Sequence, residues 1–169
     1  CDLAKVRKGQ FEGLREVIGK DPERVPDFGP NHIHPTAGAM AVGARNQIVN
    51  FNVNLDTKDM DFAKALAKKI RTSGGGLPAL RAKEIFLESK GQVQMSTVLT
   101  DYHVTSVKRV LDEMRKDLDP KGIAITGTEL IGLTTQDALT DYAVESLKVQ
   151  DFNKETQVLE TKLLKLLSS

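Results

Sequence analysis

The segment from Ile48 to Leu55 alternates strictly between apolar and amide side chains, and this pattern constrains the fold more than any other. The residues on the apolar side are Val49, Phe51, Val53 and Leu55, and those on the amide side are Asn50, Asn52 and Asn54. Period-two alternation predicts a strand with one face buried and one face open. Asparagine is uncommon in strands because its side chain competes for backbone hydrogen bonds, so three on one face require a reason.

The segments that follow complete a recognisable order of elements. A helix is predicted over Asp59–Thr72, ended by Ser73 and three glycines; a short strand over Glu84–Glu88; a turn at Ser89–Gly91; a strand over Gln92–Thr100; a helix capped by Thr105; and a strand over Ile123–Thr128. The order β-α-β-β-α-β predicts an α+β, ferredoxin-like antiparallel sheet. In this arrangement the first and third strands are neighbours at the centre, and both helices cover one face.

The third strand extends the amide pattern. Val93, Met95, Thr97 and Leu99 form its more apolar set, so Gln92, Gln94, Ser96 and Val98 share the opposite face. Carboxamides both donate and accept hydrogen bonds, which suits a neutral ligand with amide-like edges. The alternative is an ordinary solvated face, as many antiparallel sheets have. Because these two strands carry no charge on that face, we favour the ligand-binding interpretation.

Three charged residues near the strand ends are further candidates. Arg45 follows Gly43 and Ala44, where the backbone allows close approach, and its guanidinium suits a carboxylate or phosphate. Asp101 follows the third strand and is either a ligand contact or a cap for the next helix. Glu129 follows the fourth strand and either anchors a ligand amine or is solvated.

The two ends of the chain lie outside this core pattern. Leu3 to Ile18 shows helical spacing weakened by two glycines, and Asp21–Gly43 contains four prolines and reads as an ordered connector. Because the chain begins at Cys1 within a helical pattern, we expect it to be the C-terminal part of a longer protein. Thr134 and Asp137 resemble a capping box for a helix through Lys148. A last helix carries Val158, Leu159, Leu163 and Leu166, for which core packing is favoured over dimer contact.

Composition excludes several classes of function. The net charge is +1, which gives no electrostatic reason to expect nucleic acid or an anionic membrane as partner. No apolar run approaches the roughly 20 residues that span a bilayer. With one cysteine and three histidines, a zinc site is improbable. The single cysteine fits a reducing cytoplasm. His32 and His34 are interpreted as exposed loop residues rather than proton carriers, because no nucleophile or orienting acid has suitable spacing.

Six segments together resemble the glutamate formiminotransferase family, the folate enzyme of histidine breakdown. They are Pro26–Pro30 (PDFGP), His34–Ala39 (HPTAGA), Val42–Arg45 (VGAR), Phe51–Leu55 (FNVNL), Gln94–Tyr102 and Gly127–Leu133 (GTELIGL). The family enzyme has two ferredoxin-like subdomains whose sheets face each other across a tunnel for tetrahydrofolate. It moves a formimino group from N-formiminoglutamate to N5 of tetrahydrofolate, and in some organisms a cyclodeaminase is fused behind it.

The resemblance implies a division of this chain. Residues 1–20 would end an N-terminal formiminotransferase subdomain, residues 21–44 would form the connector, and residues 45–169 would form the C-terminal, folate-binding subdomain. The residues implied to line the folate side are Arg45, Asn52, Asn54, Gln94 and Ser96, with Asp101 and Glu129 as further candidates. This sequence departs from the family's pattern at three positions. They are Asn50, where the family often has a small apolar residue, Val98, where Asn is common, and Glu129, where Gln is frequent.

The resemblance also implies which partners this chain needs and which catalytic group it lacks. The family's catalytic histidine lies in the first subdomain, and no histidine of this chain matches it, so we expect this chain alone to lack transferase activity. The expected partners are tetrahydrofolate as co-substrate, formiminoglutamate, the N-terminal subdomain and a second copy in a homodimer, with no metal. The alternatives are a related enzyme that uses 5-formyltetrahydrofolate and a non-catalytic ferredoxin-like binding module.

Overall fold

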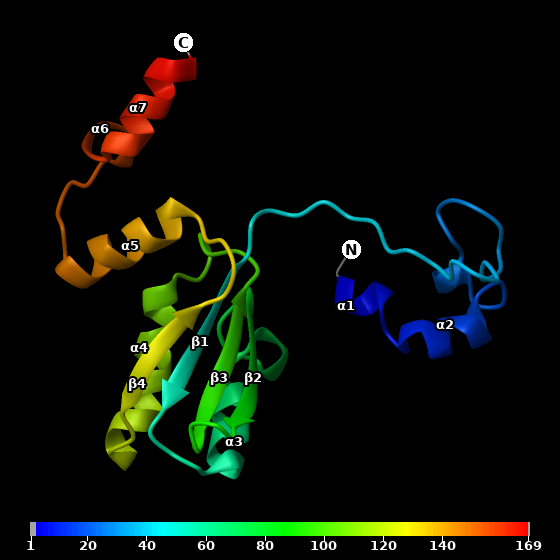
Figure 1. Cartoon of the computed structure of the whole chain (residues 1–169), viewed down its shortest axis with the longest axis horizontal. Helices are drawn as coiled ribbons and strands as arrows, with labels where there is room; N and C mark the ends of the chain where they lie inside the picture. The colour runs from blue at the N-terminus through cyan, green and yellow to red at the C-terminus, as the bar shows by residue number, and fades with distance from the viewer. Residues whose placement is uncertain (1–2, 169) are drawn as a thin grey trace. The chain divides into compact units, whose positions relative to one another are not determined.

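The computed structural model describes residues 3–168 and divides the chain into two compact units (Figure 1). The first unit ends at Arg45 and the second begins at Asn46. Expectations that rest on Cys1 lie outside the described residues.

The first unit is helical at its start and irregular afterwards. The single predicted helix is wrong: α1 (Leu3–Val6) and α2 (Gln10–Val17) are separate. The break occurs because Gly9 and Gln10 have φ angles of 79° and 54°, outside the helical region. The connector contains a short 3-10 turn, and the Arg24 guanidinium donates to the carbonyls of Val6 and Lys8 at 2.7 and 3.0 Å.

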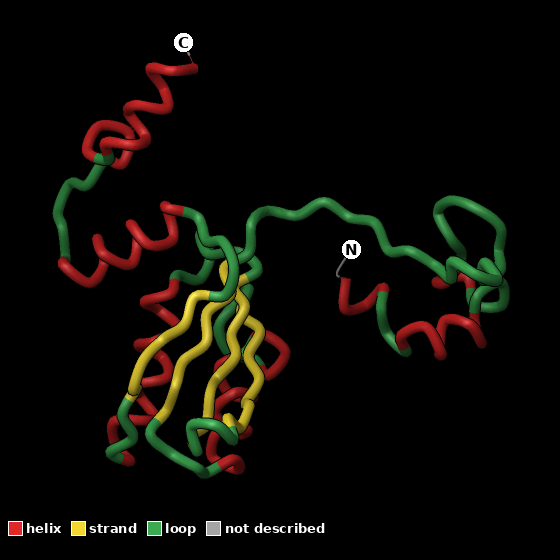
Figure 2. Tube along the Cα trace, viewed as in Figure 1, coloured by secondary structure: helices red, strands yellow, loops and turns green. Residues whose placement is uncertain are grey.

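The second unit contains the predicted ferredoxin-like sheet. The strands are β1 (Val49–Leu55), β2 (Leu80–Leu87), β3 (Gln92–Leu99) and β4 (Ile125–Leu130), all antiparallel to their neighbours in the order β2-β3-β1-β4. Figure 2 shows the four strands side by side. β1 and β3 are central and adjacent, which confirms the order expected from the sequence.

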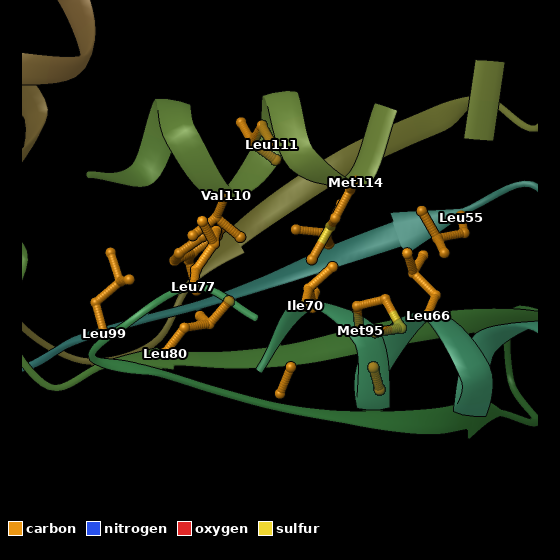
Figure 3. Packing of buried hydrophobic residues seen from close by; sticks show 14 of the residues in the cluster. Leu55, Leu66, Ile70, Leu77, Leu80, Met95, Leu99, Val110, Leu111 and Met114 are labelled. Atoms are coloured by element: carbon orange, nitrogen blue, oxygen red, sulfur yellow. The ribbon is translucent and has the colours of Figure 1, made fainter. Parts of the chain in front are cut away.

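One face of the sheet packs on two amphipathic helices, α3 (Met60–Ile70) and α4 (Val107–Leu118). Figure 3 shows Leu66 and Ile70 of α3 and Val110, Leu111 and Met114 of α4 meeting Leu55, Leu80, Met95 and Leu99 of the strands. The alternation in β1 and β3 therefore has the predicted direction, because the apolar set of each strand is buried in this core.

Several element boundaries differ from the expectations. β2 begins at Leu80 instead of Glu84, and β4 runs two residues later than expected. Ser106, rather than Thr105, caps α4, because the Thr105 hydroxyl instead donates to the Pro78 carbonyl at 2.6 Å. The helix α5 (Gln136–Leu147) is capped by Thr135 rather than by the expected Thr134, whose hydroxyl is buried without a partner among the described residues.

The last two helices are α6 (Lys154–Gln157) and α7 (Leu159–Ser168). The expectation that the apolar stripe of α7 packs into the core is wrong. Leu159, Leu163 and Leu166 are 66%, 48% and 67% exposed, because α7 makes its main contacts with the short α6 instead of with the sheet.

Candidate functional site

The candidate site is the sheet face opposite α3 and α4, which we call the amide face. β1 contributes Asn50, Asn52 and Asn54; β3 contributes Gln92, Gln94, Ser96 and Val98; β2 contributes Arg81, Lys83, Ile85 and Leu87; and β4 contributes Gly127 and Glu129. Facing residues on neighbouring antiparallel strands lie on the same side of a sheet, so the register brings these side chains together. Asn54 faces Gln94, and Asn52 faces both Ser96 and Glu129.

A hydrogen-bonded cluster occupies one end of the amide face. Gln94 Nε2 donates to Asn54 Oδ1 at 2.8 Å and to Glu129 Oε2 at 3.2 Å, and Asn54 Nδ2 donates to Glu129 Oε1 at 3.2 Å. Asn54 and Gln94 are only 7% and 4% exposed. Buried carboxamides are costly unless they are paired, and this cluster pairs them.

Lys90 completes the cluster from the turn between β2 and β3. Its Nζ lies 2.8 Å from Glu129 Oε1, and both side chains remain partly exposed. The Lys90 ammonium, followed by the amides of Asn54 and Gln94, lowers the pKa of Glu129 below its ordinary value. Glu129 is therefore a stable anion at neutral pH.

Polar side chains in the middle of the amide face have no hydrogen-bond partners among the described residues. Asn52 and Ser96 are half-buried, and within residues 3–168 neither side chain has a hydrogen-bond partner. The Asn50 Oδ1 atom is buried and accepts no hydrogen bond from the described part of the chain. These three residues therefore retain hydrogen-bonding capacity that a ligand can use.

Five of the seven predicted site residues meet on the amide face. Asn52, Asn54, Gln94, Ser96 and Glu129 lie together. Asp101 lies at the opposite end of β3 from Gln94, and its carboxylate accepts the His103 backbone N–H at 3.0 Å. Asp101 therefore stabilises a turn and does not cap α4, whose cap is Ser106, and its role as a ligand contact stays a prediction. Arg45 belongs to the other unit, so its place in the site stays a prediction.

Three cationic residues of the site were missed. Arg81 and Lys83 lie on the amide face, so this face is not free of charge as expected. They were overlooked because β2 was predicted to start at Glu84, although Leu80 and Ala82 already alternate with Arg81 and Lys83. Lys90 was assigned only a turn role, and the local sequence pattern carries no sign of its contact with Glu129, 39 residues away.

His34 and His103 have local structural roles. His34 Nδ1 accepts the backbone N–H groups of Thr36 and Ala37 at 3.3 and 3.0 Å, which stabilises an exposed turn. The His103 ring packs on Tyr102 with centroids 4.1 Å apart.

Across residues 3–168 the structure contains no cluster of three or more His, Cys, Asp or Glu side chains suited to a metal, and no helix long and apolar enough to cross a membrane.

Comparison with known proteins identifies the family. Residues 50–166 match the formiminotransferase domain, and residues 1–45 match the N-terminal subdomain of the formiminotransferase domain. The chain is 43% identical over 163 residues to glutamate formimidoyltransferase of Streptococcus pyogenes serotype M1, covering 96% of this chain and 54% of that protein. It is 37% identical over 166 residues to glutamate formimidoyltransferase of Thermoplasma acidophilum, covering 97% and 54%.

A fused relative is also similar. Formimidoyltransferase-cyclodeaminase of Mus musculus is 36% identical over 147 residues, which cover 83% of this chain and 27% of that protein. The chain spans about half the length of the first two relatives. The match to the formiminotransferase domain begins at Asn50 in β1, runs to residue 166 and includes the amide face. The chain therefore belongs to the formiminotransferase family.

Proposed function

We propose that the protein to which this chain belongs transfers a formimino group from N-formiminoglutamate to tetrahydrofolate, and that the amide face binds the folate. The observation that carries the proposal is the coincidence of family and geometry. The sheet of a formiminotransferase domain presents paired and unpaired carboxamides on one face, where a neutral heterocycle with donors and acceptors can be bound.

The chemistry of the transfer is consistent with a surface of this kind. N5 of tetrahydrofolate attacks the formimino carbon, the bond from this carbon to the glutamate nitrogen breaks, and the proton lost by N5 is balanced by one gained by the glutamate nitrogen. Such a step depends on alignment of two substrates and on a group that moves the proton. The amides of Asn52 and Gln94 neither take up nor release protons near neutral pH, so they serve alignment.

The proton-transferring group is expected outside the amide face. Among the described residues of the second unit, the sole histidine is His103, which lies beyond the opposite end of β3 from Gln94. We therefore propose that the N-terminal subdomain of the family supplies the catalytic base and that formiminoglutamate binds with its help. A cytoplasmic location and a homodimer belong to the same proposal.

The test assays the full-length protein with two alternative substrates, N-formiminoglutamate and 5-formyltetrahydrofolate. Turnover of tetrahydrofolate with N-formiminoglutamate is expected, and Asn52→Ala is expected to raise the KM for tetrahydrofolate about tenfold, the effect of losing roughly 1.4 kcal/mol of binding. Lys116→Ala on α4, whose partner Glu113 lies on the same helix, is the matched control and should leave KM unchanged. Turnover of 5-formyltetrahydrofolate alone would favour the related enzyme, and absence of both activities would favour a binding module.

A further inference from the structure

The Lys90–Glu129 ion pair spans the two central strands at the end of the amide face that holds Asn54 and Gln94. Lys90 precedes β3, whereas Glu129 belongs to β4, and β1 lies between β3 and β4. The contact of 2.8 Å therefore extends over the two central strands at the level of Asn54 and Gln94. The two buried carboxamides donate to the same carboxylate that Lys90 contacts from the solvent side.

The ion pair is easily opened. The side chains of Lys90 and Glu129 are 49% and 40% exposed, and ion pairs at this exposure contribute little to stability because water screens them and two long side chains must be ordered. The contacts from Asn54 and Gln94 are different, because their donors come from rigid, buried strand positions. Removal of the Lys90 ammonium would therefore leave the carboxylate in place.

The carboxylate has acceptor capacity for a ligand. A carboxylate offers about four lone-pair positions. Three of them accept hydrogen bonds from Lys90, Asn54 and Gln94. When Lys90 moves away, two positions are available for two neighbouring N–H donors. The 2-amino-4-oxopyrimidine ring of a pterin presents two such donors side by side, the ring N–H and the exocyclic amine, and paired contacts to a carboxylate are strong and directional.

We propose that Glu129 recognises the amino-pyrimidine edge of the pterin and that Lys90 occupies this position until the ligand displaces it. The inference rests on the proposed function, since it names the part of the folate that this end of the amide face binds. Glu129 is a specificity-determining residue in this account, and Lys90 is a competitor for its carboxylate. The competing account has Lys90 binding the carboxylates of the folate's glutamate moiety.

The experiment separates the two halves of the folate. The full-length protein is titrated calorimetrically with 6-methylpterin, which lacks a carboxylate, with p-aminobenzoylglutamate, which lacks the pterin, and with tetrahydrofolate. Glu129→Ala should weaken 6-methylpterin binding at least tenfold, and Glu129→Gln, which keeps one acceptor oxygen, should weaken it less. Lys90→Ala should tighten 6-methylpterin binding about threefold. Glu113→Gln and Lys116→Ala, a partially exposed ion pair on α4, are the matched controls and should have no effect.

Each outcome decides the inference. Pterin binding that is unchanged by Glu129→Ala, or weakened by Lys90→Ala, would overturn it, as would a loss confined to p-aminobenzoylglutamate. Binding of tetrahydrofolate that both Glu129 variants leave intact would overturn this inference while the proposed function stands. Absence of all binding, with each variant folded by its amide NMR spectrum, would overturn both.

Discussion

The Gln94 side-chain amide donates to Asn54 Oδ1 at 2.8 Å across the two central strands, and both residues are buried on the face that carries no helix. This contact fixes the carboxamides in one orientation, because each also donates to Glu129. We expect Asn54→Ala and Gln94→Ala each to lower the free energy of unfolding by about 1–3 kcal/mol, because the remaining partner loses a buried hydrogen bond.

A double-mutant cycle by urea unfolding checks this contact. The two substitutions should be non-additive, with a coupling energy of at least about 0.5 kcal/mol. Asn52→Ala is the matched control, because Asn52 lies on the same strand and face without a hydrogen-bond partner among residues 3–168, and it should change stability by less than about 0.5 kcal/mol. Additive losses for Asn54 and Gln94 would contradict the contact.

The Glu129 carboxylate should make stability depend on pH. Its native pKa lies below the ordinary value of 4.5 because Lys90, Asn54 and Gln94 favour the ionised form. A lowered native pKa means that the contribution is complete above about pH 4.5 and is lost as the pH falls through the native pKa. Wild type and Glu129→Gln should therefore differ by a constant amount at pH 5–7 and converge below pH 4.5 in thermal unfolding. A difference that grows on acidification would contradict this sign.

Gly74 should not tolerate a side chain. A Cβ atom at this position would lie 1.7 Å from the Lys68 carbonyl oxygen, so Gly74→Ala forces the turn after α3 to move. We expect a loss of about 1–3 kcal/mol, the usual effect of overpacking, measured by urea unfolding. Gly127→Ala is the control, because a Cβ there meets nothing within 4 Å and should cost less than about 1 kcal/mol. Equal effects at both positions would count against the packing of this turn.

Met95 should be among the most sensitive core positions. It is completely buried on β3 and lies between α3 and the sheet, as Figure 3 shows. Met95→Ala should lower the free energy of unfolding by about 2–5 kcal/mol through lost burial and a residual cavity. Leu163→Ala on α7, where the side chain is 48% exposed, should cost far less, and a comparable loss would show that α7 packs on the core after all.

The central strands could be predicted from sequence because their signals are local. The alternation of Val49 and Val53 with the asparagines specifies which face is buried, and a shift by one residue would reverse it. The order β-α-β-β-α-β then specifies which strands are neighbours. The residues Asn54, Gln94 and Glu129 followed from these two facts together with the family resemblance.

The parts that could not be predicted depend on long-range contacts. Thr105 and Thr134 have the local chemistry of helix caps, yet a carbonyl from Pro78 binds one hydroxyl and burial encloses the other. Lys90 reads as a turn residue, because only the folded sheet brings its ammonium to Glu129. The exposure of Leu163 depends on where α7 lies, which its own apolar spacing does not specify.

The most direct test of the account is an NMR titration of the ¹⁵N-labelled chain with 5-formyltetrahydrofolate, a chemically stable reduced folate. The central claim is that the amide face binds the folate, so the side-chain NH₂ signals of Asn52, Asn54 and Gln94 should shift together and saturate. The Asn153 side-chain signals, which come from outside the amide face, should not change. Saturable binding that leaves the three amide-face signals unmoved would contradict the account.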